Sequence, residues 1–135
     1  VIELHNHVMR GQQASAGELI ANNAIHAGFI SGKGGLTLSH CSETMFDGAR
    51  LEIFVNNQLL GQCEGQFLLE TIRLSLKWLW QDLLQSSERL HAGQIVLTGS
   101  VPNLFPVVDE CCIRVESVPF GDVAAAVKNT TLRTC

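Results

Sequence analysis

Three side chains with metal-ligand chemistry alternate along the first predicted strand. Residues 1–9 alternate between polar and apolar, so Glu3, His5 and His7 point to the same side of an extended segment. Carboxylate and imidazole groups are ordinary ligands of divalent metals, and these three could converge on one ion. A solvated strand face produces the same pattern, and the residues alone leave both interpretations open.

A second group of candidate residues follows a short apolar run. Residues 95–97 are typical of a buried strand, and Thr98, Gly99 and Ser100 come directly after them. Hydroxyls and backbone amides at a strand end can line a ligand pocket, and a Gly-Ser turn that satisfies its own backbone is the alternative. Ser100 does not stand in a Gly-x-Ser-x-Gly pattern, and residues 31–35 lack the order of a phosphate-binding loop.

Strands and one long helix must position these groups. Residues 51–55 and 59–63 flank Asn56-Asn57-Gln58, and this pattern predicts a hairpin because Asn tolerates the positive φ of tight turns. Residues 67–85 have helical spacing. The remaining predicted elements are a strand over 1–9, a loop over 11–17, a rigid loop over 102–106, strands over 111–118 and 123–127, and a tail over 129–135. Residues 18–29 form either a short helix or a turn followed by a strand, and Asn22-Asn23 favours an irregular segment.

Two apolar stripes run along the predicted helix. One stripe contains Leu69, Ile72, Leu76, Leu79 and Leu83, and the other contains Leu74 and Trp78. A helix with two such stripes is covered on two sides, by the sheet and by a second element or subunit. We therefore expect self-association into a homodimer or a larger homo-oligomer. The order of the elements predicts an α+β fold, with a mixed, bent β-sheet roll and one long helix packed on it.

Length and composition indicate a single globular domain over residues 1–135. The chain is 46% hydrophobic and 16% charged, which excludes a disordered protein. A net charge of -4 with 9 Lys and Arg argues against nucleic acid as a partner, and the apolar stretches are too short for a membrane span. Because a basic-then-apolar leader is absent, we expect a cytoplasmic protein. The cysteines lack Cys-x-x-Cys spacing, and we expect free, buried thiols at Cys41, Cys63, Cys111 and Cys112 and an exposed terminal thiol at Cys135.

A family resemblance rests on several of these segments. Residues 90–100 resemble the Leu-x-x-Gly-x-x-x-Leu-Thr-Gly-Ser segment of the 2-keto-4-pentenoate hydratase and 4-oxalocrotonate decarboxylase family, within the fumarylacetoacetate hydrolase superfamily. Ile2-Glu3-Leu4 resembles the family's Leu-Glu-Val strand, and residues 20–24 resemble its Val-Ala-Asp-Asn-Ala. Gly65, Trp78, Leu79 and Gly121 also match. The resemblance covers nearly the whole chain, but only the C-terminal part of the family.

The resemblance implies a fumarylacetoacetate hydrolase-like rolled β architecture and a metal-dependent lyase, a hydratase or decarboxylase of 2-keto-4-enoate acids. It implies that Glu3 is a ligand of Mg²⁺ or Mn²⁺, and that Thr98, Gly99 and Ser100 face the substrate. His5 and His7 have no such counterpart. Asn22 stands where the family has Asp, which removes a candidate for proton transfer.

The family also has an upstream region with a Glu-x-Glu metal pair and a basic residue for the keto acid, and this chain contains no Glu-x-Glu. One carboxylate holds Mg²⁺ weakly. We therefore expect a truncated enzyme, inactive alone, whose partners are a small-molecule 2-keto acid, further copies of itself and an upstream family segment. The alternative is a stand-alone, non-catalytic domain for assembly or small-molecule binding.

Overall fold

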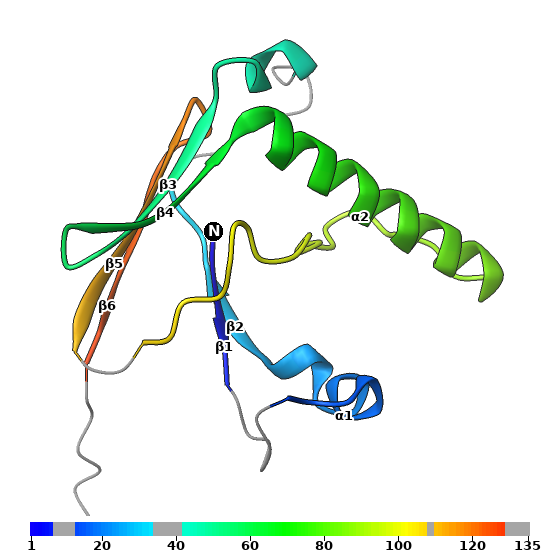
Figure 1. The fold of residues 1–135 in the computed structure, drawn as a ribbon. Helices are drawn as coiled ribbons and strands as arrows, with labels where there is room; N and C mark the ends of the chain where they lie inside the picture. The colour runs from blue at the N-terminus through cyan, green and yellow to red at the C-terminus, as the bar shows by residue number, and fades with distance from the viewer. Residues whose placement is uncertain (7–12, 34–41, 108–109, 129–135) are drawn as a thin grey trace, which may run out of the picture.

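The computed structural model describes residues 1–6, 13–33, 42–107 and 110–128. It is an α+β structure with two antiparallel sheets and one long helix (Figure 1). The two-stranded sheet consists of β1 (Ile2–His5) and β2 (His26–Ile30). The four-stranded sheet has the order β4-β3-β5-β6, with β3 at Arg50–Val55, β4 at Gln58–Glu64, β5 at Cys111–Val118 and β6 at Val123–Val127. The predicted α+β class is confirmed, but the predicted mixed sheet is wrong because the described strands pair antiparallel.

The predicted hairpin is the β3–β4 pair. Asn56 and Asn57 have φ values of 48° and 66°, the positive angles that a tight two-residue turn requires. The backbone N–H of Asn56 donates to the carbonyl oxygen of Cys112 at 2.9 Å, and its side-chain Oδ1 accepts from the N–H of Cys112 at 3.0 Å. Two hydrogen bonds therefore join the turn to Cys112, the second residue of β5.

The core lies between the two sheets. In β5, alternate residues point to the same face, and Ile113 and Val115 are buried there together with Val123 of β6. Ile2 of β1 is 8% exposed and belongs to the same cluster. Burial of these apolar side chains holds β1 against the four-stranded sheet, and this contact gives Glu3 its place in the fold.

The long helix α2 (Gly65–Gln85) confirms the prediction for residues 67–85. Figure 1 shows it starting at the end of β4 and projecting away from the four-stranded sheet. Its first stripe is partly covered, with Leu69 buried. In the second stripe Leu74 is 60% and Trp78 67% exposed, so the described residues cover this side of the helix only in part.

Shorter helices precede β2 and β3. α1 (Ala16–Ala21) is followed by the 3₁₀ turn η1 (Asn23–Ile25) and then by β2. The short helix and the strand, which the sequence left as alternatives over 18–29, are both present, and the helix begins within the predicted loop over 11–17. A capping box starts α1, since Ser15 and Glu18 exchange hydrogen bonds between side chain and backbone. Another 3₁₀ turn, η3, spans Glu43–Phe46. No described helix combines the length and the apolarity that a bilayer crossing requires.

The apolar run at residues 95–97 is not a strand, so the prediction of a buried strand there is wrong. It is an extended segment beside α2, where the hydroxyl of Ser75 donates to the carbonyl oxygen of Thr98 at 3.0 Å. Ile95 is 66% exposed. A short apolar run has the same pattern in a strand and in a segment packed on a helix, so periodicity does not separate the two.

The thiols differ in exposure. Cys63 is buried as predicted, Cys111 is half-buried, and Cys112 is exposed, which the prediction of buried thiols missed. Cys111 and Cys112 point to opposite faces of β5 because successive strand residues alternate. Cys41, Cys135, His7 and the predicted tail over 129–135 lie outside the described residues.

Candidate functional site

Glu3 lies between two histidines on β1 and β2. Nδ1 of His26 is 2.8 Å from Oε1 of Glu3, and the imidazole donates because an ionised carboxylate only accepts. Nε2 of His5 is 3.4 Å from Oε2 of the same carboxylate. The exposed fractions of the three side chains are 21% for Glu3, 23% for His5 and 26% for His26. We call these three residues the Glu3 cluster.

The imidazole of His5 is held differently from that of His26. Both of its ring nitrogens are shielded from solvent and have no hydrogen-bond partner among the described residues. Its 3.4 Å approach to Glu3 is therefore an electrostatic contact without hydrogen-bond geometry. His5 keeps unused donor and acceptor capacity beside the carboxylate.

The environment of Glu3 lowers the pKa of its carboxyl group. Partial burial is the largest influence and raises the pKa of Glu3, but the hydrogen bond from His26 and the electrostatic contacts with His5 and His26 together outweigh it. The net result is a pKa below the ordinary value of 4.5. At neutral pH Glu3 is thus a carboxylate anion, the form that binds a hard cation.

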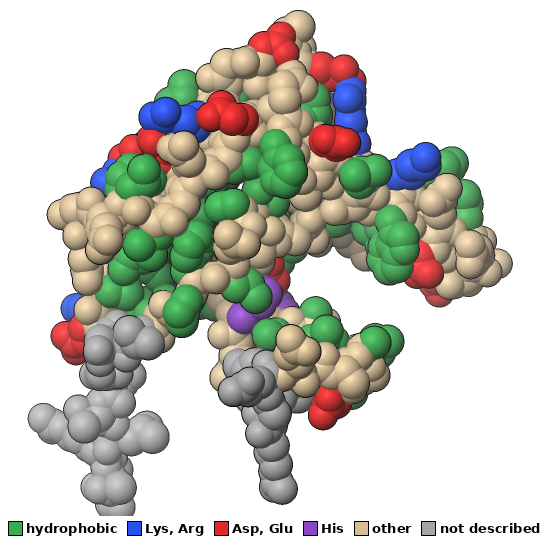
Figure 2. Space-filling model, in the orientation of Figure 1, with side chains coloured by type: hydrophobic (Ala, Val, Ile, Leu, Met, Phe, Trp, Pro, Cys, Tyr) green, Lys and Arg blue, Asp and Glu red, His purple; other side chains and the backbone are tan. Residues whose placement is uncertain are grey.

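The histidines border open space. Figure 2 shows histidine side chains gathered at the inner corner of a hollow, between the projecting α2 and the lobe that carries α1. Figure 1 shows β1 and β2 running to the same corner. A ligand of small size can therefore approach this corner from solvent.

The structure brings together two of the three residues that the first strand pattern predicted. Glu3 and His5 share one face, as their alternation indicates, and His7 lies outside the described residues. The contact from His26 was not predicted, because 23 residues separate it from Glu3 in sequence. Gly28 carried a signal, since an isolated glycine within a strand marks an irregularity of pairing.

The cluster offers one hard ligand and not a complete metal site. Within the described part of the chain, no group of three His, Cys, Asp or Glu side chains is arranged to hold a metal ion. The two imidazoles contact different oxygens of Glu3. An ionised carboxylate fits Mg²⁺ or Mn²⁺ as one ligand of a larger oxygen set, which other residues would have to supply.

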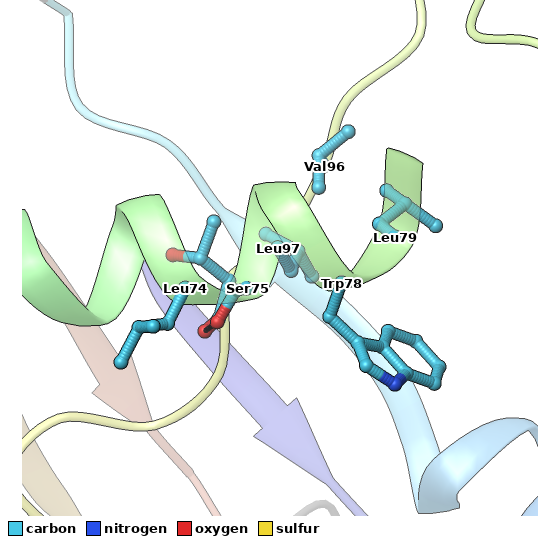
Figure 3. A pocket seen from close by; sticks show the side chains of 7 residues that line it. Leu74, Ser75, Trp78, Leu79, Val96 and Leu97 are labelled. Atoms are coloured by element: carbon cyan, nitrogen blue, oxygen red, sulfur yellow. Dashed lines mark hydrogen bonds between the residues drawn. The ribbon is translucent and has the colours of Figure 1, made fainter. Parts of the chain in front are cut away.

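A separate groove of about 470 Å³ lies between α2 and the extended segment that follows it. Figure 3 shows Leu74, Ser75 and Trp78 projecting from α2, with Val96 and Leu97 on the neighbouring segment. Apart from Ser75 and Thr98, the lining side chains are apolar or aromatic. Such a surface suits an apolar or aromatic group.

Only one of the three predicted substrate residues lines this groove. Thr98 is half-buried and lines it, whereas Gly99, with a φ of 100°, and Ser100 are exposed and do not. Glu3 is also absent from its lining. The groove is therefore not the predicted pocket in which the amides of residues 98–100 lie near Glu3.

Comparison of this chain with protein-family models, with curated proteins and with solved structures gives no match. The candidate site therefore rests on the geometry of the described residues and on the sequence motifs.

Proposed function

We propose that this chain is the C-terminal half of a divalent-metal-dependent hydratase or decarboxylase that acts on 2-keto-4-enoate acids in the cytoplasm. One observation carries the proposal. Glu3, in the segment that resembles the family's Leu-Glu-Val strand, is a carboxylate that lies between two histidines beside an open hollow. An ionised, partly exposed carboxylate on a rigid strand is suited to binding a metal.

In this proposal Glu3 supplies one ligand to Mg²⁺ or Mn²⁺. When bound, the metal supplies Lewis-acid polarisation of the 2-keto group. The exposed Gly99 and Ser100 and the half-buried Thr98 would contribute amides and hydroxyls toward the substrate. The family resemblance supports this role for residues 98–100.

The chain alone is expected to show no appreciable turnover. Glu3 is a single carboxylate, and Mg²⁺ keeps several waters and is held weakly by one such ligand. Asn22 cannot take the proton-transfer role of the Asp found in the family. An upstream family segment with its Glu-x-Glu pair and its basic residue would complete the ligand set and orient the keto acid.

The test measures the loss of dienol absorbance of 2-hydroxypenta-2,4-dienoate with Mg²⁺ or Mn²⁺. We expect turnover when an upstream family segment is added in trans, and loss of that turnover in Glu3→Gln. The matched control is Glu70→Gln, which makes the same change at an exposed position of α2. Turnover that is equal in the two variants, or that never exceeds the metal-only background, would contradict the proposal.

A second candidate is a stand-alone, non-catalytic domain that assembles or binds a small molecule. The exposed apolar side of α2 favours it, because Trp78 is 67% and Leu74 60% exposed beside the apolar groove. Association of two copies through this side would cover both residues. Light scattering on the wild type and on Trp78→Gln tests this, and a clean monomer of the wild type at micromolar concentration would count against self-association.

A further inference from the structure

A polar residue interrupts the apolar inner face of β5. Ile113, Val115 and Ser117 alternate along the strand, so their side chains share one face, and all three are buried. Ile113 and Val115 belong to the hydrophobic core, whereas Ser117 carries a hydroxyl group. Among the described residues Ser117 is the only polar residue that is buried to this extent, with 8% exposed. A buried polar side chain in an apolar row calls for a partner.

The hydroxyl group of Ser117 has no hydrogen-bond partner among the described residues. The backbone of the same residue is bonded, since its N–H donates to Oδ1 of Asp122 at 3.2 Å and its carbonyl oxygen accepts from the N–H of Gly121 at 2.7 Å. These two bonds fix the turn between β5 and β6 without using the side chain. A buried hydroxyl without a partner is unfavourable, so a molecule that bonds to it gains affinity.

Ser117 lines a pocket of about 200 Å³ at one end of the four-stranded sheet. Arg50 pairs with both Glu64 and Val118, so the start of β3 and the ends of β4 and β5 lie together there. Figure 1 shows η3, the start of α2 and the β5–β6 turn at this end of the sheet. Apart from Ser117 and Gly121, the described residues that line the pocket are apolar or aromatic. Gly121 is exposed, so the pocket opens to solvent.

The lining selects a neutral ligand with one ring. The rings of Phe46 and Phe120 both line the pocket, with centroids 4.8 Å apart and a tilt of 41°, and aromatic surface of this kind packs well against another ring. An apolar cavity of about 150 Å³ holds one benzene molecule. A pocket of about 200 Å³ therefore accommodates one ring with a small substituent. A charged substituent would be buried without a partner, because no described side chain of the lining is charged.

We infer that this pocket binds a small, neutral aromatic compound of the phenol class, whose hydroxyl group forms a hydrogen bond with that of Ser117. The ring packs between the aromatic side chains and the apolar residues of β5 and α2. The pocket shares no lining residue with the groove along α2 and includes no residue of the Glu3 cluster. The inference is therefore independent of the proposed function.

The first measurement is the stability of Ser117→Ala in urea denaturation without a ligand. Because the hydroxyl has no partner, we expect this variant to be as stable as the wild type or more stable. Ser86→Ala is the matched control, since Ser86 is exposed at the far end of α2 and its hydroxyl donates to the carbonyl oxygen of Asp82 at 3.2 Å. A Ser117→Ala chain that does not fold, or that loses more stability than Ser86→Ala, would overturn the inference.

The second measurement is a titration of the chain with phenol, followed through the ¹³C-methyl spectrum. The ring current of the ligand should move the methyl signals of Ile72 and Val115, which line the pocket. Those of Leu74 and Leu97 report on the groove along α2 and should stay in place. Shifts confined to Leu74 and Leu97, or no shift at all, would overturn the inference.

A parallel titration with benzene isolates the contribution of the hydroxyl group. One net hydrogen bond corresponds to about 2-fold to 10-fold in affinity. We expect Ser117→Ala to lower the affinity for phenol by this factor and to leave the affinity for benzene unchanged, whereas Ser86→Ala changes neither. Equal affinity for phenol in the wild type and in Ser117→Ala would overturn the inference.

Discussion

Substitution of Gly65 by alanine tests how the structure positions α2. Gly65 is the first residue of the helix, is buried, and donates its N–H to the carbonyl oxygen of Ala49 at 2.8 Å. A Cβ atom at this position would lie 2.3 Å from the carbonyl oxygen of Phe46, 2.7 Å from the Cβ of Ala49 and 3.0 Å from the carbonyl oxygen of Ala49. Two of the three obstacles are backbone atoms, which do not move aside as a flexible side chain does.

The expected cost follows from two opposing effects. Overpacking a filled site costs about 1–3 kcal/mol, and the upper part of this range applies because backbone must shift. The preference of a helix for Ala over Gly offsets at most about 1 kcal/mol. We expect Gly65→Ala to lower the free energy of unfolding by about 2 kcal/mol, or the Tm by roughly 6–10 °C for a chain of this size.

Urea and thermal denaturation followed by circular dichroism would measure this change. Gly48→Ala is the control, since a Cβ there meets nothing within 4 Å, and we expect a change below about 0.5 kcal/mol. Equal stability of the two variants would show that the junction between β4 and α2 is looser than the structure indicates.

Three further predictions follow from single residues. Burial, reinforced by the charge of Glu64, raises the pKa of the Cys63 thiol, so iodoacetamide should modify the exposed Cys112 before Cys63, as mass spectrometry of peptides would show. Asn57→Gly should stabilise the hairpin by a few tenths of a kcal/mol and Asn57→Val should cost about 1 kcal/mol in urea denaturation, because φ is 66° there. The pKa of Glu3 is lower in the folded state than its ordinary value of 4.5, so its stabilisation exists above that value and is lost as the pH falls. Glu3→Gln should therefore lose less stability than the wild type in urea denaturation between about pH 5 and about pH 3.

The elements that sequence predicted correctly have local causes. The β3–β4 hairpin forms because Asn56 and Asn57 accept positive φ between two strand-forming runs. The helix α2 forms where apolar residues recur at helical spacing. Glu3 and His5 share a face because alternate residues of any strand do so. Each of these signals lies within a few residues.

The strand predicted at residues 95–97 failed for a non-local reason. Its apolar run required a partner strand, but the structure provides the side of α2, where Ser75 bonds to Thr98. An apolar run indicates that a segment is buried against another element, but it does not indicate whether that element is a strand or a helix. Because this segment packs on α2, Thr98 lines a groove formed with the helix, and Glu3 is not part of the groove lining.

The sequence by itself therefore determined the α+β class, the hairpin, the long helix and the carboxylate of the candidate site. The tertiary structure decided that His26 bonds to Glu3, because a register change of one residue at Ala27 turns that side chain to the other face of β2. It also decided which side of α2 is covered and which leaves Trp78 exposed. Both outcomes depend on pairing and packing between distant segments, and no local pattern of residues specifies the partner.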